Sequence, residues 1–234
     1  MSASAQPAFG RLRRQHRSDE PDVAQYRYGA VFILILTTVV FLIIAPEGDA
    51  SRAIGFAIAG AALIVSIVTS RERSVVRRRR VVVASVTIVV VTVLTAAGAI
   101  PHAATQGISV VMTVAVPLTL GGGLLRLVRE RGATPQAVAG GLAIYLLLGL
   151  AFASVIGFVA GIGSTHYFAQ TAQDTTSQRV YYSFTVLTTT GFGDFTAAQG
   201  VGRAIAVVEM LVGQIYLVTV ISILIGRRIE QARS

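Results

Sequence analysis

The sequence predicts an all-α integral membrane protein whose chain crosses the bilayer six times. Three observations lead to this prediction. The 234-residue chain is 53% hydrophobic and only 13% charged, whereas a soluble domain carries about 25% charged residues. Its apolar residues are gathered in six long runs, and the loops between these runs alternate between arginine-rich and arginine-poor.

Each apolar run approaches the roughly 20 residues that an α-helix needs to cross about 30 Å of hydrocarbon. Lipid cannot satisfy backbone polar groups, so helices are expected even for the Val- and Ile-rich segment 81–93. A cleaved signal peptide is the alternative for the first run, but a long polar stretch precedes it and Ala-Pro-Glu at 45–47 is a poor cleavage site. The predicted spans are residues 28–45, 53–70, 81–100, 107–125, 136–161 and 201–226.

The charges of the loops predict which side of the membrane each loop faces. Residues 71–80 hold six arginines and residues 126–131 hold three, whereas residues 46–52 hold one and residues 101–106 hold none. The positive-inside rule places the arginine-rich loops in the cytoplasm. Because the pattern alternates with every crossing, both termini are predicted to be cytoplasmic, in a multi-pass protein of the cell membrane.

All 20 basic residues are arginine, and the formal net charge is +9. We interpret the absence of lysine as a composition bias typical of a GC-rich bacterial genome. Nucleic-acid binding is disfavoured because the arginines lie in short runs between apolar segments. The run at residues 77–80 is interpreted as a topology signal, with binding of anionic membrane lipids as the alternative.

The sequence offers little support for catalysis or for a bound cofactor. The absence of cysteine excludes disulfides and thiolate sites, and no set of nucleophile, base and orienting group indicates an enzyme. A secondary transporter would show inverted repeats and paired broken helices, and no such repeat is found. The sequence does not exclude a non-conducting scaffold protein.

A segment too short to span the membrane lies between the last two apolar runs. A polar loop at residues 162–175 leads into an apolar and aromatic segment, 178–188, and residues 188–194 read Thr-Thr-Thr-Gly-Phe-Gly-Asp. Non-helical backbone is tolerated at membrane depth only where protein buries it or where it lines a water-filled cavity. The segment is therefore predicted to be re-entrant, the alternative being an ordinary Gly-rich turn between two helices.

The re-entrant segment has the residues needed to line a pore with backbone carbonyls. Rings of carbonyl oxygens can replace the hydration shell of a potassium ion. Inward-pointing carbonyls on successive residues require unusual dihedral angles, and Gly191 and Gly193 can adopt positive φ without a Cβ clash. The Thr189 hydroxyl adds one oxygen at the inner end. One chain supplies one strand and a ring needs four, so four subunits are expected around one axis.

Two residues complete the predicted filter. Phe192 is expected to point away from the ion path and to pack behind the strand, and Asp194 adds negative charge that concentrates cations at the outer mouth. The predicted potassium-coordinating residues are Thr189, Thr190, Gly191, Phe192 and Gly193.

Residues 189–194 resemble the filter motif Thr-Val-Gly-Tyr-Gly-Asp of the potassium channel pore family. They most resemble bacterial members in which extra membrane helices precede the two pore helices. The likeness covers roughly residues 136–228 and includes Glu-Met-Leu-Val-Gly-Gln-Ile-Tyr at 209–216. It implies a homotetrameric, potassium-selective channel with permeant K⁺ ions in its filter. The residues implied to support the filter from the pore helix are Tyr181, Tyr182, Thr185 and Thr188.

The segment departs from the family motif at three positions. Thr190 replaces the usual Val or Ile, and Phe192 lacks the tyrosine hydroxyl that ties the filter to the pore helix in many relatives. Thr185 stands where some relatives bury a carboxylate. These departures predict a less firmly braced filter with stronger gating, and they leave a non-selective monovalent cation channel as the alternative function.

The last apolar run carries the candidate gate. Gln214, Leu217 and Ile221 are three and four residues apart and share one helical face, which by analogy lines the cavity and inner mouth. Leu217 and Ile221 could form a hydrophobic constriction, or they could take part in ordinary helix packing. Gly213 is either a hinge or a point of close helix packing.

Glu209 is the only acidic residue deep in a predicted membrane helix, which makes it a candidate functional residue. It lies about 140° around the helix from Gln214. We therefore expect its side chain to face the pore helix and to brace it through a hydrogen bond. A pH sensor is the alternative role.

The first four helices are not predicted to form a voltage sensor. Such sensors carry several arginines inside their fourth helix, whereas residues 107–125 contain none. Pro117 and the glycines at 121–123 are expected to kink or end that helix. The predicted organisation is a disordered tail at 1–27, a four-helix domain at 28–131, a pore domain at 135–228 and a short tail at 229–234.

Overall fold

The computed structural model describes four main segments of the chain, residues 27–48, 102–131, 134–163 and 166–222, together with isolated residues between 50 and 93 and residue 226. Several predictions fall wholly or mostly outside the described residues. They concern the two tails, the second and third apolar runs (53–70 and 81–100) and the arginine-rich loop at 71–80.

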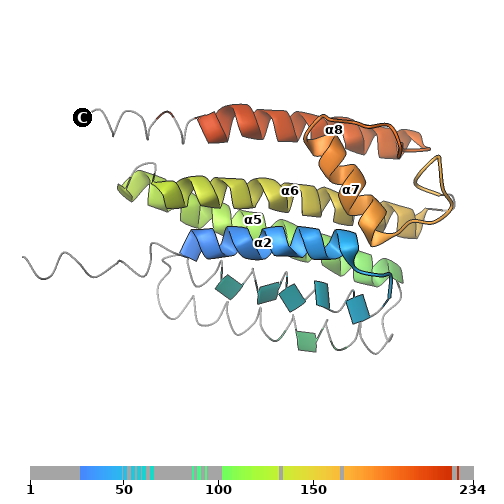
Figure 1. Cartoon of the computed structure of the whole chain (residues 1–234), viewed down its shortest axis with the longest axis horizontal. Helices are drawn as coiled ribbons and strands as arrows, with labels where there is room; N and C mark the ends of the chain where they lie inside the picture. The colour runs from blue at the N-terminus through green and yellow to red at the C-terminus, as the bar shows by residue number, and fades with distance from the viewer. Residues whose placement is uncertain are drawn as a thin grey trace, which may run out of the picture.

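The regular elements of the described segments are helices, joined by irregular stretches at residues 166–175 and 188–199. The elements are α2 (Arg27–Ile44), α5 (His102–Arg131), α6 (Pro135–Ile162), α7 (Thr176–Leu187), α8 (Gly200–Tyr216) and a π-helical turn, η2 (Leu217–Ile221). The long helices α2, α5, α6 and α8 lie alongside one another, and the short α7 runs obliquely between α6 and α8 near one end (Figure 1). Within these segments the β-structure consists of an isolated bridge between Phe168 and Ala197, so the all-α prediction holds for them.

Two described helices have the length and composition to cross a membrane, Pro135–Ile162 and Gly200–Val220. They coincide with the fifth and sixth predicted spans. The first and fourth predicted spans correspond to shorter apolar helices, Tyr28–Ile44 and Thr113–Leu125. The count of six crossings stays a prediction.

Helix α5 runs without interruption through Pro117 and the glycines at 121–123. The prediction was that these residues would kink or end the helix, and they do not end it. Leu120 and Leu124 fix this stretch by packing into the buried cluster that α5 shares with α2 and α6.

Helix α6 is the centre of the described core, because small residues along it let its neighbours approach closely. A Cβ placed on Gly140 would lie 2.9 Å from Cδ1 of Tyr28 in α2, and one on Gly149 would lie 2.7 Å from the ring of Phe184 in α7. Glycine at helix contacts is typical of packing in membranes, where close backbone approach replaces the hydrophobic effect. Thus α6 supports α2 on one side and the short helix α7 on another.

Candidate functional site

The first turn of α7 is closed by reciprocal hydrogen bonds. The Gln178 backbone N–H donates to Thr175 Oγ1 over 3.1 Å, and the Thr175 backbone N–H donates to Gln178 Oε1 over 3.0 Å. This capping box satisfies two amides that the helix leaves without intrahelical partners. It fixes where the short helix begins.

The end of α2 also reaches this first turn. The Thr176 backbone N–H donates to Glu47 Oε1 over 2.6 Å, and Ser177 Oγ donates to the Ile43 carbonyl over 2.7 Å. A carboxylate is favourable here because helix N-termini carry partial positive charge. The contacts join the start of α7 to a segment about 130 positions earlier in the chain.

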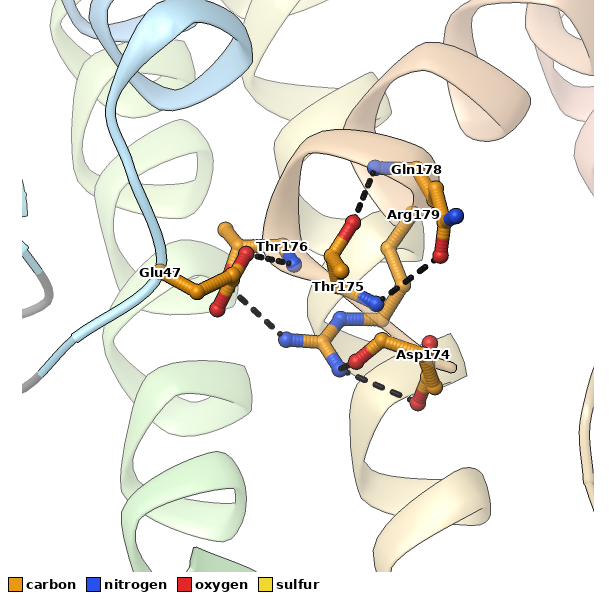
Figure 2. Close-up of polar contacts among 6 residues, drawn as sticks. All are labelled: Glu47, Asp174, Thr175, Thr176, Gln178 and Arg179. Atoms are coloured by element: carbon orange, nitrogen blue, oxygen red, sulfur yellow. Dashed lines mark hydrogen bonds and ion pairs between the residues drawn. The ribbon is translucent and has the colours of Figure 1, made fainter. Parts of the chain in front are cut away.

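Arg179 lies among acidic groups at the same end of α7. It is 8% exposed, and its Nη1 lies 3.0 Å from Asp174 Oδ2. Figure 2 shows Asp174 beside the guanidinium and Glu47 beside Thr176, whose Oγ1 accepts a hydrogen bond from Arg179 Nη2 over 3.1 Å. Burial raises the pKa of Asp174 above its ordinary value, the nearby Arg179 opposes the rise, and the charge of Glu47 adds to it. The outer end of α7 is therefore held mainly by charged and polar side chains.

The two tyrosines predicted to support the filter face different parts of the molecule. Tyr182 is buried and makes edge-to-face contacts with Tyr167 and Phe168, whose ring centroids lie 6.2 and 5.3 Å away. Tyr181 stacks on Phe192 with a centroid separation of 6.4 Å and an interplanar angle of 8°. The pair therefore anchors α7 to the preceding loop on one side and to the predicted filter on the other.

The C-terminal end of α7 packs directly against α6 and α8. The Tyr145 hydroxyl donates to the Leu187 carbonyl over 3.2 Å. A Cβ on Gly213 would collide with that same carbonyl oxygen and would lie 2.9 Å from Leu187 Cδ1. This geometry favours close packing over a hinge as the reason for glycine at position 213.

Glu209 joins three helices at a fully buried point. Its side chain is 0% exposed and is hydrogen-bonded to Ser183 Oγ on α7, which also lies 2.7 Å from the Gly149 carbonyl on α6. The side chain thus faces α7, the predicted pore helix, as the helical geometry predicts. A serine hydroxyl has one proton, so both contacts are hydrogen bonds only when Glu209 itself carries a proton.

The segment after α7 has an alternating backbone conformation. Thr189, Gly191 and Gly193 have φ values of 57°, 50° and 81°, and the residues between them have negative φ. Alternation of left-handed and right-handed residues turns successive peptide groups toward the same side of the chain. The glycines take the positive φ that a carbonyl-lined strand requires. Sequence reasoning did not predict the positive φ of Thr189, because positive φ is rare for a β-branched residue.

The beginning of this segment is fixed to the last turns of α7. The Thr185 carbonyl accepts from the backbone N–H groups of Thr190 and Gly191 over 2.9 and 3.1 Å. The hydroxyls of Thr188 and Thr190 lie 2.9 Å apart. Thr185 thus supports the segment through its backbone rather than its side chain, while Thr188 contributes its hydroxyl.

The outer part of the segment is open in a single chain. Phe192 is 69% exposed, with one ring face covered by Tyr181. Asp194 is exposed, accepts from the Phe195 backbone N–H over 3.1 Å and interacts electrostatically with the Tyr181 hydroxyl. Its carboxylate therefore lies close to α7.

The chain beyond Asp194 is tied to the loop that precedes α7. Ala169 N–H donates to the Thr196 carbonyl over 2.9 Å beside the Phe168–Ala197 bridge. The Gln170 side-chain amide donates to Thr196 Oγ1 over 2.8 Å and accepts from the Thr196 N–H over 2.9 Å. The stretch that follows Asp194 thus has a polar frame made from both loops that flank α7.

On α8, Gln214 reaches the inner end of the segment, where its Nε2 donates to Thr189 Oγ1 over 3.0 Å. Leu217 begins η2 and Ile221 ends it, with the Ile221 side chain outside the described part. The face predicted for Gln214, Leu217 and Ile221 assumes α-helical spacing, and the π-helical turn changes that spacing. A constriction at Leu217 and Ile221 stays a prediction.

Several residues of this site were missed by sequence reasoning. Ser183, Arg179 and Glu47 belong to no sequence motif. The partners of Ser183 and Glu47 lie on distant segments, and Asp174, the partner of Arg179, lies in an irregular loop. The Thr-x-x-Gln pattern at 175–178 is the one local signal that could have located the start of α7.

Residues 141–229 match the family model described as ion channel. The match spans most of α6, all of α7 and α8, and the segment between them. No curated protein and no solved structure matches the chain. Together with the apolar helices, the family match supports an ion channel built into a membrane.

Proposed function

We propose that the chain is one subunit of a homotetrameric channel that conducts K⁺ passively and selectively across the cell membrane. The observation that carries the proposal is the alternation of φ at Thr189, Gly191 and Gly193. It gives one side of the segment a row of carbonyl oxygens, which is the chemistry that can replace the hydration shell of an alkali cation.

The ion-coordinating groups would be the carbonyls of residues 189–193 and the Thr189 hydroxyl. Four copies of the segment would surround each ion with oxygen dipoles and no formal charge, so ions can bind and still leave. Asp194 at the outer mouth would raise the local cation concentration. Conduction would need no covalent step and no cofactor.

A tetramer is supported by surface that a single chain leaves uncovered. Each chain supplies one carbonyl-lined segment, and closure of a ring requires rotational symmetry. Phe192 and the α8 residues Val208, Leu211 and Ile215 are all more than half exposed. In the proposed assembly, neighbouring subunits and membrane lipid cover these apolar side chains.

The proposed topology has six crossings and both termini in the cytoplasm. The arginine-rich loops favour this orientation, and it puts the capped start of α7 and Asp194 on the outer side. Potassium ions would enter the filter from that side past Asp194, or from the cytoplasm past Gln214.

The test is ²²Na⁺ and ⁸⁶Rb⁺ flux, with ⁸⁶Rb⁺ as a tracer for K⁺, into liposomes that contain the purified protein, with Gly191→Ala beside a matched glycine variant. A Cβ at Gly191 or at Gly200 would meet nothing within 4 Å in a single chain, but only Gly191 has positive φ, 50°. We expect barium-sensitive K⁺-type flux in wild type and in Gly200→Ala, and its loss in Gly191→Ala.

Other results would redirect or defeat the proposal. Equal flux of both cations would indicate a non-selective monovalent cation channel, the alternative that Thr190 and Phe192 leave open. Normal selective flux in Gly191→Ala would show that the ion path does not depend on this segment. Folded tetramers that bind no K⁺ would contradict the proposed filter.

A further inference from the structure

We propose that Gln214 is a positioning residue for the innermost cation site, because its amide holds the Thr189 hydroxyl with an oxygen lone pair free for the ion. This inference rests on the proposed function. It assigns a role to a specific contact between α8 and the filter segment.

The hydrogen bonds around Thr189 Oγ1 define its orientation. The hydroxyl donates its proton to the Thr188 carbonyl over 2.7 Å and accepts from Gln214 Nε2 over 3.0 Å. A hydroxyl has one proton and two lone pairs. With the proton donated and one lone pair occupied, the second lone pair is left for a cation.

The amide orientation of Gln214 follows from the same count. If Oε1 faced Thr189, it would bring an acceptor against an oxygen whose proton is already donated to Thr188. With Nε2 facing Thr189, a donor meets an acceptor. The contact therefore favours the state in which the hydroxyl proton is turned away from the ion path.

Thr189 is a residue that needs such support. Its φ of 57° is positive, which is uncommon for a β-branched side chain and strains the backbone. The hydrogen bond from Gln214 acts on the side chain of this strained residue, and thus helps to hold the first carbonyl of the filter in place.

The packing of α8 explains why position 214 can reach Thr189. Gly213 has no Cβ, so the α8 backbone lies directly against the Leu187 carbonyl at the end of α7. On the two sides of this contact, Glu209 is bonded to Ser183, and the Tyr216 hydroxyl donates to the Gly141 carbonyl over 2.7 Å. With α8 fixed before and after it, the Gln214 amide meets the segment that follows α7.

The test measures barium inhibition and the K⁺/Na⁺ permeability ratio for the full chain in planar bilayers. Barium is the probe because it is a divalent cation close in size to K⁺. We expect Gln214→Leu to weaken inhibition by cytoplasmic barium about fivefold to tenfold, which corresponds to one neutral hydrogen bond. Ile215→Leu, at the neighbouring exposed position, is the matched control and is expected to match wild type.

A double-mutant cycle with Thr189→Val separates this role from a general effect on α8. Valine keeps the β-branched shape and removes the hydroxyl. If Gln214 acts through that hydroxyl, Gln214→Leu has no further effect in the Thr189→Val background. Full additivity of the two substitutions, or unchanged barium inhibition in Gln214→Leu, would overturn the inference.

Calorimetric titration of the purified protein with barium provides a readout that does not depend on an open gate. We expect weaker barium binding in Gln214→Leu, with Ile215→Leu unchanged. A wild type that conducts and binds barium, beside an unaffected Gln214→Leu, defeats the inference alone. A wild type that neither conducts K⁺ nor binds barium defeats the proposed function, and the inference with it.

Discussion

The two ends of helix α7, the proposed pore helix, are held by different kinds of contact. At its first turn, Glu47 caps a backbone amide, and Arg179 pairs with Asp174. At its last turn, Tyr145 donates to the Leu187 carbonyl and the glycine at 213 allows α8 to pack against it. The contacts at the first turn include ionised groups beside the uncharged capping box, whereas the contacts at the last turn depend on shape and on uncharged hydrogen bonds.

This difference indicates which part of the chain can influence each end. The inner contacts come from α6 and α8, which lie largely within the ion channel match at 141–229. Two outer contacts come from the end of α2 and the segment after it, at Ile43 and Glu47, and both lie outside the match. A change in α2 would therefore act on the first turn of α7 first, while the last turn forms a fixed base for the segment proposed as the filter.

The largest effect is expected at the inner end, from Gly213→Ala. The new Cβ would collide with a backbone carbonyl that cannot rotate away, so we expect about 3 kcal/mol of destabilisation, the upper end for overpacking. Thermal unfolding of the purified protein measures it. Gly122→Ala is the matched control, because its Cβ would meet nothing within 4 Å. A stable Gly213→Ala protein with altered gating would favour the hinge interpretation instead.

The second effect is expected at the middle of α7, where Ser183 bridges Gly149 and Glu209. Ser183→Ala leaves both partners buried without their hydrogen bond, and we expect a loss of about 2 kcal/mol. Glu209→Gln should be close to wild type, because an amide N–H can supply the proton that the chain of contacts requires. Thermal unfolding of both variants tests this order of effects.

The same variants address the role of Glu209 in gating. If it senses pH, flux through the wild type depends on pH and Glu209→Gln removes that dependence. Equal destabilisation by Glu209→Gln and Ser183→Ala would contradict a protonated carboxyl at this point. In that case the middle of α7 would resemble its outer end rather than its inner one.

The sequence predicted the features of this site that depend on local geometry. The 100° rotation per residue of an α-helix predicted that the Glu209 side chain faces α7. The glycines at 191 and 193 predicted the positive φ values at these two positions. Contacts between distant segments could not be predicted, since no periodicity links Glu47 to Thr176 or Gln214 to Thr189. The conformation of Thr189 was missed for another reason: surrounding contacts override its own backbone preference.

The third effect is expected at the outer end, from Arg179→Gln. The variant leaves the Asp174 carboxylate largely buried without its cation, and we expect a loss of about 1.5 kcal/mol at pH 7, the low end for hydrogen bonds to charged groups. The pKa of Asp174 is raised by burial and should rise further without Arg179. Protonation of Asp174 removes the penalty, so the deficit shrinks as the pH falls through that raised pKa toward the ordinary value.

Thermal unfolding as a function of pH measures this deficit, with Asp174→Asn as the matched background. Because Asn carries no charge, Arg179→Gln should lose little stability in that background, and the pH dependence should disappear. A deficit that grows on acidification would mean that the pair does not behave as a buried carboxylate with its cation. Glu47→Gln keeps an acceptor for Thr176 and tests the contribution of charge alone.

The smallest effect is expected from Phe192→Tyr, because Phe192 contacts neither the first nor the last turn of α7. Phe192 contacts the pore helix by stacking on Tyr181, and this contact lacks the directional hydrogen bond that a tyrosine could add. We expect the added hydroxyl to lengthen open-state lifetimes by about twofold to fivefold, equivalent to a fraction of one hydrogen bond. Single-channel recordings at constant voltage measure it, with Phe195→Tyr as the control outside the filter. Unchanged lifetimes would show that the stacked rings already brace the filter as firmly as a hydrogen bond, and that its gating is set at the inner end.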